Sequence, residues 1–126
     1  MIGDDLRART RLFSLGIVDL CDALPPSPTL SLLRDQLFRA GTAVGANYRA
    51  ACRSRSGKEF ISRLAVVLEE ADESEFWLDV LDYRRAGNAS AVKRLRQEAA
   101  ELRAILAASR RTAIANLQKA QSIDPA

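Results

Sequence analysis

The chain has 126 residues, of which 48% are hydrophobic and 28% are charged, and its formal net charge is +3 at pH 7. This length and composition predict one folded domain over residues 1–126 and argue against a disordered chain. No apolar run approaches the roughly 20 residues of a membrane-spanning helix, so we expect no membrane partner. The chain has no histidine, which removes the commonest general base and the commonest zinc ligand. We therefore expect neither an enzyme nor a metal protein, and no cofactor.

The first amphipathic pattern predicts a helix over residues 4–24. Asp4 and Asp5 suit its start, because carboxylates stabilise the positive end of the helix dipole, and two prolines after Leu24 end it. Its apolar positions recur with the helical period and are Ile2, Leu6, Phe13, Ile17, Leu20 and Leu24.

The second pattern predicts a helix over residues 28–53. Ser27 followed by Pro28 is typical of an N-cap and a first helical position. The apolar stripe consists of Leu30, Leu33, Leu37, Ala40, Gly41, Val44, Tyr48 and Ala51. Its small residues permit close approach of a neighbouring helix. Asn47 lies at the edge of this stripe, and we expect it to hydrogen-bond across the bundle and set helix register.

The third pattern predicts a helix over residues 57–86. The run from Ser56 to Glu59 matches a capping box, in which the serine oxygen accepts an N–H and the glutamate reaches back to the N–H of the cap. The apolar stripe consists of Phe60, Leu64, Val67, Ala71, Ser74, Leu78 and Leu81. Gly87 and Asn88 are expected to end the helix.

The last pattern predicts a helix over residues 89–120. Its apolar stripe consists of Val92, Leu95, Ala99, Leu102, Leu106, Ala113 and Leu117. Four apolar stripes joined by short links predict an all-α fold, an antiparallel up-down-up-down four-helix bundle.

The predicted third helix carries a second apolar strip, formed by Phe76, Val80 and Tyr83 and flanked by Trp77. These residues lie nearly opposite the main stripe, where a helix of a monomeric bundle faces water. Large apolar side chains there favour self-association, and we assign the four residues to an oligomer interface. The alternative is that they contact a further neighbour inside the bundle.

Charges are segregated along the chain. Residues 69–82 contain seven acids and no base. Two groups of bases flank this segment, one at the junction of the second and third helices and one that recurs every seven residues along the last helix. The groups are Arg49, Arg53, Arg55 and Lys58 at the junction, and Arg96, Arg103 and Arg110 on the last helix.

These basic groups suit the phosphates of RNA or DNA, because guanidinium groups can contact successive phosphates. Few aromatic residues lie among them, so base stacking is not indicated. The alternative is that the arginines pair with the acidic helix of the same or a neighbouring chain. Glu73 and Glu75, and a pairing of Arg55 with one of them or with Glu59, would then hold the bundle together.

The two cysteines, Cys21 and Cys52, are separated by 31 positions and belong to no metal-binding motif. The residues after Met1 are polar and charged, unlike a secretory segment. We expect both thiols to be reduced and the protein to be cytoplasmic.

Several short motifs recur in one known family, and their positions here are Gln36-Leu37, Arg39-Ala40, Ala46-Asn47-Tyr48, Ser56, Glu59-Phe60, Leu68, Glu73 and Glu75. In these the chain resembles the bacterial four-helix-bundle proteins first noticed as reading frames in intervening sequences of 23S ribosomal RNA genes. The chain departs from the family pattern at Ala51-Cys52, where many members have Glu-Gly, and at Glu69-Glu70, where they have Gly-Ser.

The resemblance implies a cytoplasmic bundle that assembles into rings, typically homopentamers, and most such proteins have no assigned activity. A related group comprises accessory proteins of diversity-generating retroelements, which associate with a reverse transcriptase and nucleic acid. With the residues above, this predicts a non-enzymatic homo-oligomer that binds RNA, DNA or a nucleic-acid enzyme through basic surfaces. The alternative is a structural or regulatory protein-interaction module that binds no nucleic acid. No small-molecule substrate is indicated.

Overall fold

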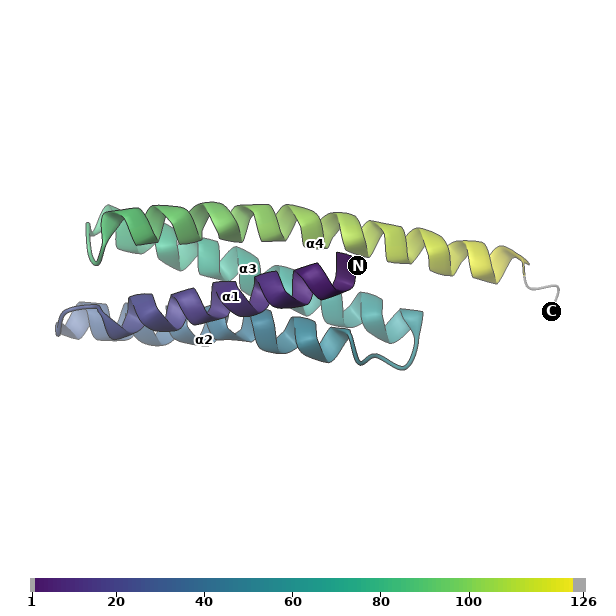
Figure 1. The fold of residues 1–126 in the computed structure, drawn as a ribbon, viewed down its shortest axis with the longest axis horizontal. Helices are drawn as coiled ribbons and strands as arrows, with labels where there is room; N and C mark the ends of the chain where they lie inside the picture. The colour runs from purple at the N-terminus through teal and green to yellow at the C-terminus, as the bar shows by residue number, and fades with distance from the viewer. Residues whose placement is uncertain (1, 124–126) are drawn as a thin grey trace.

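The computed structural model describes the backbone of residues 2–123 and the side chains of residues 5–122. It contains four helices, α1 (Ile2–Asp22), α2 (Pro28–Ala51), α3 (Gly57–Tyr83) and α4 (Ala89–Ile123). Successive helices run in alternating directions and each packs on the next, so the predicted antiparallel four-helix bundle is confirmed (Figure 1). The side chains of Ile2 and Asp4, to which the sequence assigned roles, lie outside the described residues.

The helix boundaries lie within three residues of the predicted ones, and the ends of α3 and α4 each differ by three residues. Helix α3 ends at Tyr83 because Arg85 has a positive φ of 52°, a left-handed conformation that stops a helix. Gly87 also has a positive φ, of 76°. Asn88 caps the next helix instead of ending α3, since its side-chain oxygen accepts a hydrogen bond from the N–H of Ala91 at 2.9 Å.

The two predicted serine caps are confirmed. Ser27 accepts a hydrogen bond from the N–H of Leu30 at 3.2 Å, and Ser56 accepts one from the N–H of Glu59 at 3.1 Å. The Glu59 carboxylate reaches back one residue further than predicted, to the N–H of Arg55 at 3.1 Å. Orphan N–H groups at the start of both helices are thereby satisfied.

The four predicted stripes form the core. The fully buried larger side chains come from all four helices and include Ile17, Leu37, Val44, Leu64, Val67, Leu78, Leu81, Val92, Leu102 and Leu106. Ala113 and Leu117, predicted as core, are half-buried because this part of α4 extends past the beginning of α1 (Figure 1).

The contact between α1 and α2 is unusually close. The Ser14 hydroxyl donates to the carbonyl of Gly41 at 2.7 Å and accepts from the N–H of Gly45 at 2.9 Å. A Cβ at Gly41 would lie 2.6 Å from Cγ2 of Ile17, so only glycine fits this approach. The glycines were expected to permit close packing, whereas the role of Ser14 was not predicted.

The edge between α1 and α4 is the least closely packed of the four. Arg9 bridges it by donating to both carboxylate oxygens of Glu98, at 2.8 and 2.7 Å, and it also contacts Glu101 at 3.3 Å. These hydrogen bonds raise the pKa of Arg9. This edge therefore combines the charged contact of Arg9 with close packing of Leu95 on Gly16, beside a hollow of about 410 Å³.

Candidate functional site

The arginine row on α4 lies against the acidic residues of α3 in the same chain. Arg96 pairs with Asp79 at 2.9 Å and with Asp82 at 3.4 Å. Arg103 contacts Glu75 at 3.1 Å and a second acid, Asp72, at 3.8 Å. The acidic face of α3 therefore receives these two arginines, as the alternative interpretation of the sequence expected.

The third member of the row, Arg110, lies beyond the acidic segment. Its Nε donates to the carbonyl oxygen of Ile61 at 3.1 Å. The side chains of Arg96 and Arg103 keep 42% and 44% of their surface exposed, so all three arginines bridge α4 to α3 at the rim of the bundle. Nucleic acid could bind there only in competition with these contacts.

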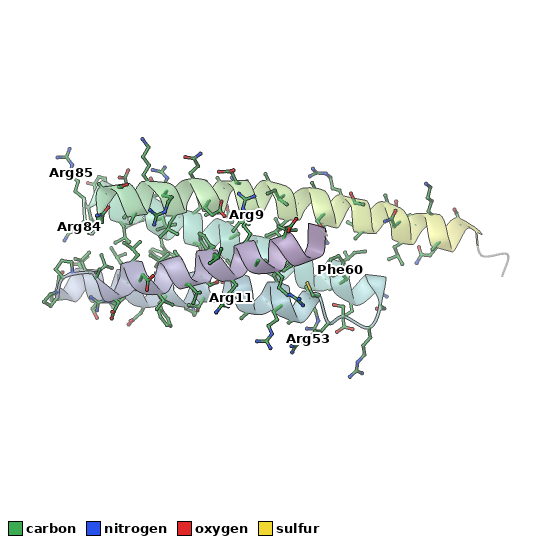
Figure 2. All side chains as sticks on the ribbon, in the orientation of Figure 1. Arg9, Arg11, Arg53, Phe60, Arg84 and Arg85 are labelled. Carbon is green, nitrogen blue, oxygen red and sulfur yellow. The ribbon has the colours of Figure 1, made fainter. Side chains whose placement is uncertain are left out.

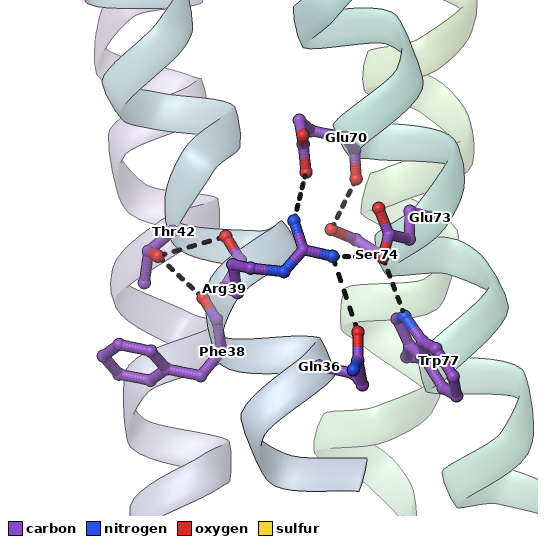
Figure 3. A network of polar contacts seen from close by, with 8 residues as sticks. All are labelled: Gln36, Phe38, Arg39, Thr42, Glu70, Glu73, Ser74 and Trp77. Carbon is purple, nitrogen blue, oxygen red and sulfur yellow. Dashed lines mark hydrogen bonds and ion pairs between the residues drawn. The ribbon is translucent and has the colours of Figure 1, made fainter. Parts of the chain in front are cut away.

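A second ion-pair network joins α2 to α3 through Arg39 (Figure 3). Its guanidinium contacts the carboxylates of Glu70 and Glu73, and the Trp77 Nε1–H donates to Glu73 at 3.3 Å. Burial raises the pKa of Glu70, with the nearby Glu73 charge acting in the same direction. Glu73 and Glu75 therefore do connect helices, but to Arg39 and Arg103 and not to Arg55.

Within residues 5–122, the cations at the basic junction between α2 and α3 are not ion-paired, unlike Arg39, Arg96 and Arg103. The four cations, Arg49, Arg53, Arg55 and Lys58, are exposed and have no ion-pair partner among the residues that the structure describes. The one acid nearby, Glu59, pairs with Arg63 at 2.8 Å. Arg63 also donates to the carbonyl of Ala50 at 3.2 Å and lines a hollow of about 480 Å³ with Arg53, Arg55 and Glu59. This end of the bundle therefore presents unneutralised positive charge.

Helix α1 adds positive charge that the sequence analysis did not assign. Arg7 and Arg11 line a hollow of about 390 Å³ between α1 and α2, opposite Arg49. Figure 2 shows Arg11 and Arg53 on the same side of the bundle, with Arg84 and Arg85 at its far end. The i, i+4 spacing of Arg7 and Arg11 was a signal that both lie on one helix face, but their proximity to α2 depends on the fold.

The second strip of α3 points away from the core, as expected. Phe76 is 55% exposed and Tyr83 is 85% exposed, while Val80 is half-buried. Trp77 packs partly against the core, and its ring makes an edge contact with Phe76 at a centroid distance of 5.0 Å. Val66, 43% exposed, continues this face toward the start of the helix. An apolar face of this kind is a candidate contact surface.

Asn47 and Phe60, two residues of the family motifs, make no specific polar side-chain contact among the described residues. Asn47 is half-buried and makes no side-chain hydrogen bond to the described part of the chain, so the expected contact across the bundle is not found. Phe60 is half-buried and packs against the core from the first turn of α3. Both residues therefore belong to the scaffold.

The described residues hold no metal-binding cluster. Within residues 5–122, no three His, Cys, Asp or Glu side chains are grouped so that they could hold a metal ion. Both cysteines are free, and Cys21 is buried whereas Cys52 is exposed. Burial raises the pKa of the Cys21 thiol to about 11, which leaves it protonated and unreactive at neutral pH. No helix within residues 2–123 has the length and apolarity required to cross a membrane.

The fold has a known counterpart. A crystal structure of a protein of unknown function from the S23 ribosomal protein family of Bacteroides thetaiotaomicron superposes with a TM-score of 0.80 at 26% sequence identity. The similarity covers 88% of this chain and 99% of that one. A search of curated proteins finds no match.

The family model for the 23S rRNA-intervening sequence protein matches residues 5–108, which include most of α1, all of α2 and α3, and more than half of α4. This range contains the motifs on which the resemblance was based. The chain therefore belongs to the family of 23S rRNA-intervening sequence proteins.

Proposed function

We propose that this protein is a non-enzymatic, self-associating four-helix bundle that binds nucleic-acid phosphates through the basic junction between α2 and α3. The observation that carries the proposal is the contrast in ion pairing. Arg53, Arg55 and Lys58 are exposed without acidic partners among the described residues, while Arg96 and Arg103 are engaged by α3. Unpaired guanidinium and ammonium groups are free to replace the counterions of a phosphate backbone.

The chemistry of the junction favours backbone contacts over base recognition. Arginine forks form two parallel hydrogen bonds to a phosphate, and the lysine adds a point charge. The aromatic residues nearest in sequence are Tyr48, which is buried, and Phe60, which packs against the core. We therefore expect binding that depends strongly on salt and weakly on sequence.

The test compares two triple variants that lose the same charge. Arg53→Ala, Arg55→Ala and Lys58→Ala remove the junction, while Arg84→Ala, Arg85→Ala and Lys93→Ala remove three exposed cations from the opposite end of the bundle. Binding of labelled single-stranded RNA and DNA is followed by fluorescence anisotropy between low and moderate salt. We expect the junction variant to lower the slope of log K against log salt by about 2, since each phosphate contact contributes about 0.7 for a single strand.

Equal losses in the two triple variants would show that net charge alone drives binding and would contradict the proposal. So would an absence of binding at low salt.

Self-association is proposed through the outer strip of α3, with a pentamer as the expected stoichiometry. Phe76→Ser with Tyr83→Ser should shift the sedimentation coefficient toward that of a monomer, because the exposed apolar area is lost. Leu12→Ser with Leu32→Ser is the matched control, since these leucines are 64% and 70% exposed on other helices. A monomeric wild-type protein at tens of micromolar would refute the assembly.

The second candidate function is a structural or regulatory interaction module without nucleic-acid binding. The ion pairs of Arg96 and Arg103 with α3 favour it, because they show that basic and acidic helices neutralise each other within one chain. It predicts that the junction variant and the control bind nucleic acid equally poorly. The binding experiment above therefore separates the two candidates.

A further inference from the structure

The bundle has an unpartnered groove to which the proposed function assigns no role. It follows the seam between α1 and α2 and consists of two consecutive hollows of about 390 and 380 Å³. We call this seam the α1–α2 groove, and its charged lining residues are Arg7, Arg11, Asp22, Arg34 and Arg49. Four of these residues are arginines and one is an acid, and the groove also holds the exposed apolar side chains of Leu15 and Phe38.

The outer face of α3 complements the groove, because it combines exposed apolar side chains with an acidic residue. Phe76 and Val66 supply exposed apolar surface, and Glu69 lies between them on the same side of the helix. Glu69 is exposed and has no ion-pair partner among the described residues. On the groove side, Arg11 is likewise exposed and without an acidic partner in the described part of the chain.

Contacts between neighbouring helices show which residues lie at the same level along the bundle. Ser14 of α1 is hydrogen-bonded to Gly45 of α2, and Arg39 of α2 is paired with Glu73 of α3. All helices rise by the same 1.5 Å per residue, and successive helices are antiparallel. Because Ser14 is also bonded to Gly41, it lies level with the middle of the Gly41–Gly45 segment, and counting from there places Arg11 within about one helical turn of Glu69.

The same counting brings the apolar parts of the two surfaces into register. Phe38 lies three residues before Gly41, which is also bonded to Ser14, and is next to Arg39. It is therefore within about one turn of the level of Phe76. In a ring whose axis runs along the helices, neighbouring copies are related by rotation without a shift, so surfaces at equal levels meet.

The outer α3 face carries less free charge than its acidic sequence suggests. Six of the seven acids between positions 69 and 82 pair with Arg39, Arg96 or Arg103, which leaves Glu69 as the acid of this segment without an ion-pair partner among the described residues. Like charges facing each other across an interface oppose association, whereas opposite charges support it. Charge therefore favours a contact of α3 with the basic groove of another copy.

We propose that the α1–α2 groove of one copy receives the outer face of α3 from a second copy, with Arg11 facing Glu69 and Phe38 near Phe76. This inference rests on the proposed self-association and specifies its geometry. Because the two contacting surfaces differ, the interface is head-to-tail, and such interfaces close into rings when the rotation permits.

Charge reversal and its rescue test the pairing by sedimentation velocity near the concentration at which the wild-type protein is half assembled. Arg11→Glu and Glu69→Arg should each weaken association about tenfold or more, because each places like charges opposite each other. The double variant restores opposite charges and should return association to near the wild-type level. Arg111→Glu, an exposed reversal on α4, is the control and should leave association unchanged.

A cross-linking experiment tests the head-to-tail geometry directly. In a Cys52→Ser background, which removes the exposed thiol, one chain carries Arg11→Cys and another carries Glu69→Cys. A short thiol cross-linker should join the mixed chains and leave each chain alone uncrosslinked. Cross-linking of the Glu69→Cys chain to itself would show α3 against α3 and would overturn the inference.

The outcomes separate this inference from the proposed function. If Phe76→Ser with Tyr83→Ser dissociates the protein but Arg11→Glu does not, self-association holds and the groove assignment is wrong. If the wild-type protein is a monomer at tens of micromolar, both are wrong. Rescue by the double variant supports the stated pairing.

Discussion

The helix pairs α1–α2 and α3–α4 are held together by different forces. Between α1 and α2, backbones approach closely at Gly41, Ser14 bonds to both sides of that contact, and Arg34 donates to the carbonyls of Cys21 and Leu24, each at 3.1 Å. Between α3 and α4, Arg96 and Arg103 bridge to acids. Arg11 of the first pair is therefore exposed and available for external contacts, while Arg96 and Arg103 of the second pair are engaged by acids.

The largest effect should come from filling the close contact between α1 and α2. Gly41→Ala would place Cβ 2.6 Å from Cγ2 and 2.9 Å from Cβ of Ile17, so the helices must move apart. Overpacking of this kind costs about 1–3 kcal/mol of unfolding free energy, measured by urea denaturation.

The matched change is Gly57→Ala, at the first residue of α3. Its Cβ would meet only Leu117, at an ordinary 3.8 Å, so stability should be unchanged or slightly increased. Equal losses at the two positions would contradict the assignment of α1–α2 packing to close backbone approach.

The next effect distinguishes the two sets of arginines. Replacing Arg96, Arg103 and Arg110 by glutamine should lower the unfolding free energy by about 1–2 kcal/mol, because three partly exposed bridges are lost, and high salt should reduce the difference. Replacing Arg11, Arg53 and Arg55 by glutamine removes the same charge and should change stability by less than about 0.5 kcal/mol. Equal losses of unfolding free energy in the two triple variants would contradict the conclusion that only the first set of arginines supports the fold.

A smaller change of opposite sign is expected at Glu70. Burial raises the pKa of this carboxyl, so the folded protein holds the proton more tightly than the unfolded chain does. The resulting stability is present below the unfolded pKa of about 4.3 and is lost as the pH rises through the folded pKa. Glu70→Gln should therefore stabilise the protein at pH 7 by about 0.5–1 kcal/mol, with the gain shrinking in acid. A destabilised variant at pH 7 would show that the contact with Arg39 outweighs the cost of burial.

The last prediction concerns the reactivity of the two cysteine thiols and reports on the α1–α2 seam. The pKa of Cys21 is raised to about 11, while Cys52 is exposed, so a thiol reagent at pH 8 should modify one thiol per folded chain and two after unfolding. The Gly41→Ala variant should expose Cys21 sooner, because both residues lie at the same seam. Equally fast reaction of both thiols in the folded wild-type protein would show that this seam opens readily.

Most of the scaffold could be predicted from local patterns. The apolar stripes predicted the four helices, and the serine caps at Ser27 and Ser56 predicted where two of them start. Both signals are local, because caps and periodicity depend on residues within a few positions of each other. The end of α3 was placed three residues too late, since the left-handed conformation of Arg85 has no marker in its residue type. The site was predicted less well, because a list of basic residues does not show which of them face acids.

The sequence by itself determined that this chain forms four amphipathic helices, that it resembles the 23S rRNA-intervening sequence family and that its charges are segregated. Tertiary structure alone decided the partners of those charges: Arg39 and Arg103 lie against α3, while Arg11 and Arg53 face outward. The physical reason is that helix periodicity is a short-range property, whereas an ion pair depends on which residues of two different helices lie at the same level and on adjoining faces.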